Sequence, residues 1–371
     1  MIATSGAARE VRSPALASAH ATSGYRMMFV RQRCHGRGAR AAGRAVAAVR
    51  AHLVALTLLA AVSAKAAGEP PHWPQRPLKI VAAQQSGGAT DNVARIIAEA
   101  LEKELGVAVT VENRPGAGGK IGAEAVARSA PDGYTLLVGG TSNLVIGPAV
   151  EPDVRYDPAH DFAPIGRVAH VPFGFAVNAA VPAHTLKELA ALARARPGGL
   201  TYVSLGPATT TGFGTSMFLR EAGVDMLAIE YRGIATAIPD VLGGRVDLVF
   251  NEVALLAQNA AGGHLRALAI ASPRRSPRLP DVPTTAEQGF PRVVMSAWYG
   301  LVAPSGIPPE AQKRLLEAYR AIARSPVVRA RIESLGYEPI DESPAQFAAA
   351  MREEAAMVRG LTVKAPGPGT R

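Results

Sequence analysis

The sequence has almost no cysteine, and its histidines form no pattern that suits a metal. Its 371 residues include one cysteine, Cys34, which lies in an N-terminal part that we expect to be removed. A disulfide and a cysteine-based metal or redox site are therefore excluded for the rest of the chain. The histidines after residue 66 show no pair at metal-ligand spacing; they are His72, His160, His170, His184 and His264. The sequence predicts no metal centre.

The chain also lacks net charge once its N-terminal segment is set aside. The whole sequence carries +10, which on its own suggests binding to nucleic acid or to a membrane surface. Residues 1–66 hold ten of the 40 lysines and arginines but one acidic residue, Glu10, so +9 of the charge belongs to them. The remainder carries +1, and we therefore expect no nucleic-acid partner.

Residues 51–64 form an apolar run that is too short to span a bilayer as a stable helix. The run follows an arginine-rich region and precedes Ala64-Lys65-Ala66, a small-residue cleavage pattern. We interpret residues 1–66 as a secretory signal peptide with a disordered upstream extension, cleaved after Ala66 or two residues earlier. An apolar helix of the fold is the alternative, and a start at Met27, Met28 or a later codon stays open.

The glycine-rich stretch 116–122 fits neither of the common nucleotide-binding loops. A phosphate-binding loop needs Ser or Thr after Lys120, where this chain has Ile121, and its first glycine position is occupied by Arg114. The last glycine, Gly122, also lies one place late for a dinucleotide fingerprint. No G-x-S-x-G elbow is present. Nothing in the sequence requires a cofactor or an enzyme.

After a proline-rich entry the sequence shows a regular alternation of strands and helices. This alternation predicts an α/β fold with parallel sheets covered on both faces. We expect strands at 78–83, 107–111, 134–138, 161–168, 173–177, 200–205, 228–231, 246–251, 265–271 and 293–302. We expect helices from about 91 to 105 and at 121–129, 185–196, 213–222, 235–242, 254–260, 308–323, 326–335 and 344–363.

Several expected strands end in loops that are rich in small hydrogen-bond donors. In the first of them, 84–90, Gly87 and Gly88 permit positive φ and allow backbone N–H groups to face a ligand at a helix N-terminus. Such a position suits an anion. Because ligands of open α/β sheets sit at the carboxyl ends of strands, two facing lobes would bring these loops to one cleft. The candidate ligand-binding residues are Gln84, Gln85, Ser86, Gly87, Gly88, Asp91, Thr141, Ser142, Ser204, Gly206, Thr209, Thr210, Tyr231 and Glu252.

Some of these residues also have a purely structural interpretation. Asp91 suits the N-cap or first turn of its helix. Glu252 would repel a carboxylate but suits an amino group or hydroxyl of a ligand. Trp298 and Tyr299 fit a core as well as a ligand wall, and Arg232 fits a solvated or ion-paired surface position.

Seven segments together resemble the Bug family, the TctC-like extracytoplasmic solute receptors of tripartite tricarboxylate transporters. The resemblance covers about His72 to Val363. The segments are Trp73-Pro74-Gln75-Arg76-Pro77, Gly87-Gly88 with Asp91 and Ala94-Arg95, 111–119, 130–137, Tyr231-Arg232-Gly233, 242–248 and 279–284.

The resemblance implies a type II periplasmic-binding-protein fold, with two αβ lobes, a central ligand cleft and crossover hinge strands. The first lobe would comprise residues 67–170 and 272–371, the second 171–271, with the hinge near His170 and Ala271. The implied function is capture of a small carboxylate by main-chain amides in the periplasm. The implied partners are the membrane subunits of the transporter, with the receptor itself a monomer.

Three stretches depart from the family pattern, so the identity of the ligand is not predicted. The usual Pro-Phe-Pro-Pro is replaced by Ala83-Gln84-Gln85-Ser86. The usual Ser-x-Gly-Asn-Gly-Ser-x-Ser-His is replaced by 204–212, in which Pro207 removes an N–H group. The usual Phe-Asp-Asn is replaced by Phe250-Asn251-Glu252.

Two other functions stay open on the sequence alone. A secreted α/β enzyme acting on small acids would require a nucleophile with a base in hydrogen-bond reach at the cleft. A sensor receptor that reports to a signalling protein would share the binding mechanism and differ only in its partner.

Overall fold

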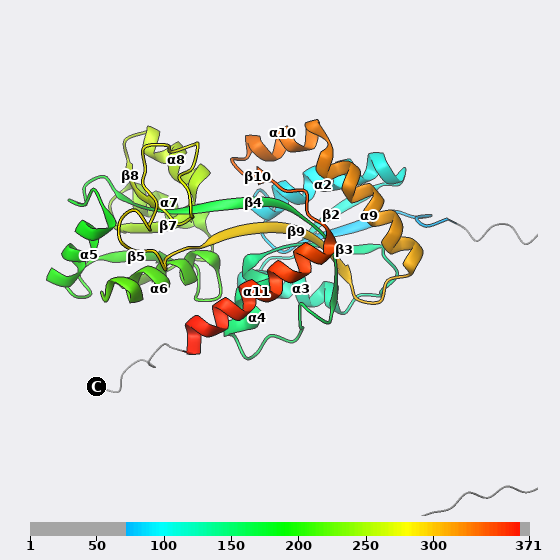
Figure 1. Cartoon of the computed structure of the whole chain (residues 1–371), viewed down its shortest axis with the longest axis horizontal. Helices are drawn as coiled ribbons and strands as arrows, with labels where there is room; N and C mark the ends of the chain where they lie inside the picture. The colour runs from blue at the N-terminus through cyan, green and yellow to red at the C-terminus, as the bar shows by residue number, and fades with distance from the viewer. Residues whose placement is uncertain (1–71, 364–371) are drawn as a thin grey trace, which may run out of the picture. The chain divides into compact units, whose positions relative to one another are not determined.

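The computed structural model describes residues 72–363, and the predictions for the signal peptide, its cleavage site and Cys34 lie outside these residues. The strands are β1 Leu78–Ala82, β2 Val109–Asn113, β3 Thr135–Gly140, β4 Phe162–Asn178, β5 Thr201–Ser204, β6 Leu227–Glu230, β7 Leu248–Glu252, β8 Leu265–Ile270, β9 Ser296–Pro304 and β10 Glu338–Pro339 (Figure 1). The α-helices are α2 Ala89–Leu105, α3 Lys120–Ala127, α4 Gly147–Val150, α5 Leu186–Ala195, α6 Thr210–Ala222, α7 Ile234–Leu242, α8 Val253–Ala261, α9 Pro309–Arg324, α10 Pro326–Ser334 and α11 Pro344–Val363. Two short helices of other types are η1 Ala117–Gly119 and η2 Ser142–Ile146.

The first strand and helix form as their apolar spacing predicts. β1 is a short apolar run between neighbours on both edges, and Ile80 and Val81 are fully buried. In α2, Val93, Ile97 and Leu101 recur at helical spacing and are buried on the face that packs against the sheet. The helix ends at Gly106, whose φ of 73° is the left-handed conformation that a glycine favours after a helix.

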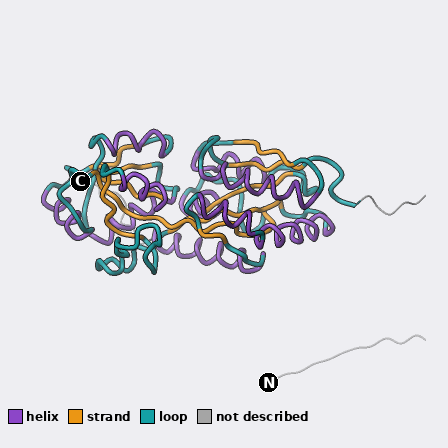
Figure 2. The backbone as a smooth tube through the Cα atoms, turned by 90° about the horizontal axis from the view of Figure 1, so that it is seen from above, coloured by secondary structure: helices purple, strands orange, loops and turns teal. Residues whose placement is uncertain are grey.

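The strands form a mixed sheet in the order β2-β1-β3-β9-β4-β7-β5-β6, with β8 and β10 also paired to β4. β1 runs parallel to β2 and β3, and β5 runs parallel to β6 and β7. The expectation of purely parallel sheets is wrong in the centre, where β9 is antiparallel to β3 and β4, and β4 is antiparallel to β7. Helices lie on both sides of the strands, as expected (Figure 2).

The two strand segments expected at 161–168 and 173–177 are one strand of 17 residues, β4. Its first part pairs with β9 and its second part with β7 and β8 (Figure 1). Two prolines made the sequence look interrupted, because proline lacks an N–H for a sheet. Pro164 lies at a shift of register, and Pro172 lies where β9 ends as a partner and β7 begins. Both positions tolerate the missing donor.

Residues 142–150 are helical, although their sequence does not predict a helix. η2 is a single π-helical turn that continues into α4. β-branched residues, Gly147 and Pro148 make this stretch a poor helix former. Leu144, Val145 and Ile146 are nonetheless fully buried, so tertiary packing overrides the local preference.

Candidate functional site

The loop after β1 folds back on itself around Asp91. The Asp91 carboxylate accepts hydrogen bonds from the Gly87 N–H at 2.9 Å, Arg95 Nε at 3.0 Å and Asn113 Nδ2 at 2.9 Å. The side chain is buried, which by itself raises the pKa of Asp91, but the hydrogen bonds from Arg95, Gly87 and Asn113 outweigh burial and hold the pKa below its ordinary value. The carboxylate is therefore ionised at neutral pH and fixes the shape of the loop.

Some backbone N–H groups of this loop donate hydrogen bonds to other residues of the same loop. Gly87 has the expected positive φ, 80°, but its N–H donates to Asp91, which corrects the expectation that this group faces a ligand. The Gly88 N–H donates to the Gln85 carbonyl at 3.1 Å. Gln84 Oε1 accepts from the Thr90 N–H at 3.2 Å. Ser86 is exposed and finds no hydrogen-bond partner for its N–H or hydroxyl anywhere in residues 72–363.

The loops after β3 and β5 touch each other, although 68 residues separate them in the sequence. The Ser142 and Thr210 hydroxyls lie 3.3 Å apart, and the Thr210 N–H donates to Ser142 Oγ at 3.2 Å. Thr141 is buried, and its hydroxyl accepts from the Trp298 N–H at 3.0 Å, which fixes the end of β3 against β9. Two of the predicted strand-end loops therefore meet.

The loop from Ser204 to Thr209 is closed by hydrogen bonds onto the start of α6. Ser204 Oγ accepts from the Gly206 N–H at 3.2 Å, and the Gly206 carbonyl accepts from the Thr209 hydroxyl at 2.8 Å. Thr209 is the N-cap of α6 and accepts from the Gly212 N–H at 3.0 Å. These hydrogen bonds place the N-terminus of α6 beside the loop that follows β3.

Glu252, the last residue of β7, reaches two tyrosines from distant parts of the chain. The Tyr299 hydroxyl donates to Glu252 Oε1 at 3.2 Å, and the Tyr337 hydroxyl donates to Oε2 at 2.8 Å. Burial raises the pKa of Glu252, and the hydrogen bonds from Tyr337 and Tyr299 offset only part of that rise. The side chain of Thr90 also contacts the Tyr299 hydroxyl, which connects Glu252 to the start of α2.

The Tyr231 side chain is held by residues outside the predicted site. Its hydroxyl donates to Asp240 Oδ2 at 2.6 Å, and Asp240 also pairs with Arg245. Its N–H donates to the Ser204 carbonyl at 2.9 Å, so only the main chain of Tyr231 is joined to the loop.

Comparison with known proteins decides the family. The model of the family described as "Tripartite tricarboxylate transporter family receptor", TctC, matches residues 93–365. The chain belongs to the TctC family. It is 33% identical over 301 residues to Protein BugT of Bordetella pertussis, covering 77% of this chain and 92% of that protein. TctC proteins are receptors of a transport system rather than a family of enzymes.

Solved structures of similar proteins share the fold. The periplasmic binding protein BugD is 33% identical, with a TM-score of 0.72 over 79% of this chain and 98% of BugD. An R. palustris protein with adipate is 31% identical, with a TM-score of 0.73 over 78% of this chain and 97% of that one. MatC of Rhodopseudomonas palustris with bound malate is 29% identical, with a TM-score of 0.72 over 78% of this chain and 99% of MatC. The periplasmic-binding-protein fold expected from the sequence is confirmed.

Several residues that shape this TctC site were not predicted. Asn113 and Arg95 hold Asp91, and both lie in segments that were noticed for their resemblance alone. Tyr337 gives no local signal, because it lies 85 residues after Glu252 and meets it through the fold. Trp298 and Tyr299 are both core residues, and the Tyr299 hydroxyl in addition reaches Glu252.

A cavity of about 730 Å³ lies between α6 and the end of α11, and Pro207 of the loop between β5 and α6 is part of its lining. It is lined by Val150, Phe213, Leu219, Arg220, Leu361 and Thr362, among others, and by none of the predicted site residues. The Arg220 guanidinium donates to the Leu361 carbonyl at its edge.

Neither a metal cluster nor a membrane span is found in the part of the chain that the structure describes. No three His, Cys, Asp or Glu residues within 72–363 are grouped so that they could hold a metal ion. No helix in that range combines the length and apolar character needed to cross a bilayer.

Proposed function

We propose that this protein is a periplasmic receptor that captures a small organic carboxylate between two lobes. In this proposal the lobes are residues 67–170 with 272–371, and residues 171–271, as the family resemblance implies. The observation that carries the proposal is the contact between Ser142 and Thr210, because it joins a strand-end loop of one lobe to a strand-end loop of the other. The adipate and malate in two similar structures support a carboxylate as the ligand.

Two helix N-termini supply the positive side of the proposed site. α2 begins after Gly88 and α6 begins after Thr209, and the partial positive charge of a helix N-terminus favours an anion. About four to six charge-assisted hydrogen bonds of roughly 1.5–3 kcal/mol each cover the roughly 8 kcal/mol of a micromolar complex, before ordering costs. The residues proposed to form the site around these termini are Gln84, Gln85, Ser86, Gly87, Gly88, Asp91, Thr141, Ser142, Ser204, Gly206, Thr209 and Thr210. In this set Gly87 and Asp91 act by holding the loop in shape.

We further propose that the receptor is exported by its signal peptide and acts as a monomer. It would deliver its ligand to the membrane subunits of a tripartite tricarboxylate transporter. The membership of the chain in the TctC family supports this partner.

Thermal unfolding in the presence of small acids tests the proposal. A ligand at about 100 times its Kd stabilises the native state by about 2.7 kcal/mol. For a protein of this size we expect a rise in Tm of roughly 5 °C or more with at least one carboxylate. The control is the amide of the same acid, which keeps the size but lacks the charge and should give no shift. Equal shifts with acid and amide, or no shift with any acid, would contradict carboxylate capture.

A further inference from the structure

Glu252 is a carboxylate without a cationic partner in the middle of the fold. The ion pairs formed within residues 72–363 do not include it, and its contacts are the hydroxyls of Tyr299 and Tyr337. Two other carboxylates within residues 72–363 are ion-paired: Glu342 with Arg167, and Asp91 with Arg95. Glu252 is therefore placed in a way that structural ion pairing does not explain.

The two tyrosines leave the carboxylate with acceptor capacity to spare. An ionised carboxylate offers about four lone-pair sites, and a tyrosine hydroxyl has one proton to donate. Each tyrosine spends that proton on one oxygen of Glu252. When Glu252 is ionised, its remaining sites can only accept hydrogen bonds, so the ligand group that satisfies them must be a donor. A second carboxylate at this position would be repelled.

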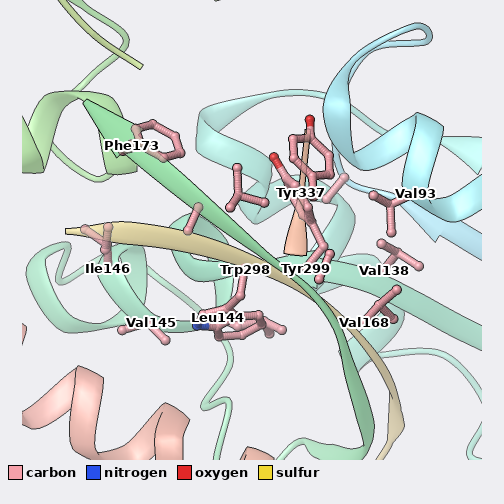
Figure 3. Close-up of a cluster of buried hydrophobic side chains, with 14 of the residues drawn as sticks. Val93, Val138, Leu144, Val145, Ile146, Val168, Phe173, Trp298, Tyr299 and Tyr337 are labelled. Atoms are coloured by element: carbon pink, nitrogen blue, oxygen red, sulfur yellow. The ribbon is translucent and has the colours of Figure 1, made fainter. Parts of the chain in front are cut away.

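The cluster lies beside the loops proposed to bind the ligand. Tyr299 pairs with Gly140 in the β3–β9 register, directly before Thr141 and Ser142. The side chain of Thr90, at the start of α2, contacts its hydroxyl. Tyr299 and Tyr337 project to the same side of the crossing strands, between Phe173 and Val93 (Figure 3). Tyr299 thus connects Glu252 to the start of α2 and to the end of β3, which precedes Thr141 and Ser142.

We infer that Glu252 makes the receptor select a carboxylate whose far end carries a hydrogen-bond donor, either a hydroxyl or an ammonium group. A second ionised carboxylate at that end is disfavoured. The inference rests on the proposed function, since the near carboxylate is held as described above. It assigns to Glu252 the specificity for the distal group, with Tyr299 and Tyr337 as positioning residues.

Calorimetry with acids of matched length tests the inference. The four-carbon set is succinate, γ-hydroxybutyrate, γ-aminobutyrate and butyrate; the six-carbon set is adipate, ε-hydroxyhexanoate, ε-aminohexanoate and hexanoate. We expect the wild-type protein to bind a hydroxy or amino acid of one set at least about tenfold more tightly than the dicarboxylate. The two donor acids in each set distinguish a hydroxyl from an ammonium ligand.

Glu252→Gln keeps the size of the side chain and removes its charge. We expect the ratio of the donor acid's affinity to the dicarboxylate's affinity to fall at least about tenfold in this variant. A general defect in folding would weaken all acids alike and leave the ratio unchanged. Glu230→Gln removes the same charge from the exposed edge strand β6 and should leave the ratio as in the wild type. If Glu252→Gln does not fold, Tyr337→Phe, which weakens the anionic form of Glu252, should move the ratio in the same direction by a smaller factor.

Each outcome separates the inference from the proposed function. Tight binding of the dicarboxylates by the wild type, or an unchanged ratio in Glu252→Gln, overturns the role of Glu252 and leaves carboxylate capture standing. Failure of every acid in both sets to bind overturns the proposed function and the inference together.

Discussion

Gly212→Ala is expected to weaken carboxylate binding about a hundredfold or more while the protein still folds. A Cβ at Gly212 would lie 2.1 Å from the Gly206 carbonyl oxygen, far inside van der Waals contact. Backbone cannot move aside as a flexible side chain can, so the Gly206 turn must shift. That shift displaces Ser204 and Thr209, which are hydrogen bonded to Gly206. The loss of two charge-assisted hydrogen bonds, at about 1.5–3 kcal/mol each, gives the expected factor.

Gly360→Ala is the matched control for this substitution. Gly360 lies in α11 with nothing within 4 Å of the added Cβ, and alanine is the better helix former. We expect unchanged binding and equal or slightly higher stability. Calorimetry gives the affinity of both variants, and circular dichroism checks that both are folded. Wild-type affinity in a folded Gly212→Ala protein would exclude the β5–α6 loop from the site.

Trp298→Ala is expected to lower the free energy of unfolding by about 3 to 5 kcal/mol. Trp298 is 1% exposed, lies within the buried cluster of Figure 3, and meets Phe347 edge-on with ring centroids 5.0 Å apart. Phe347 belongs to α11, so the substitution removes an aromatic contact between that helix and β9. The Nε1 of Trp298 also donates to Glu354 Oε2 at 2.6 Å.

Trp298→Phe separates the hydrogen bond from the packing. It keeps an aromatic ring but leaves Glu354 Oε2 without this donor, and burial already raises the pKa of Glu354. We expect a smaller loss, about 1 to 3 kcal/mol. Urea unfolding curves of both variants and the wild type give the comparison. A loss below about 1 kcal/mol for Trp298→Ala would mean that α11 is not held through this residue.

Local sequence patterns were enough to predict most strands and helices, because apolar spacing and turn residues act over a few positions. The run 78–83 and the helical period from Val93 to Leu105 correspond to β1 and α2 almost residue for residue. Patterns failed where distant packing decides the backbone. β4 accommodates Pro164 at a shift of its register against β9, and Pro172 where its partner changes to β7. Residues 142–150 are helical because their apolar side chains are buried.

The candidate site was predictable as a set of loops but not as a set of contacts. The sequence identified Ser142 and Thr210 separately, and only the fold brings them within hydrogen-bond distance. Gly87 was included because a glycine can adopt positive φ. The sequence could not reveal that Asp91 accepts a hydrogen bond from the Gly87 N–H. The hydrogen bond between Tyr337 and Glu252 joins residues that lie 85 positions apart, so no local pattern could predict it.

A crystal structure of the protein with the acid that binds most tightly locates the ligand directly. We expect its carboxylate within hydrogen-bond distance of Ser86 and of the N-terminus of α6, between the loops that follow β1 and β5. A ligand found instead in the cavity lined by Phe213, Arg220 and Leu361, without contact to Ser86, would contradict capture at the strand ends.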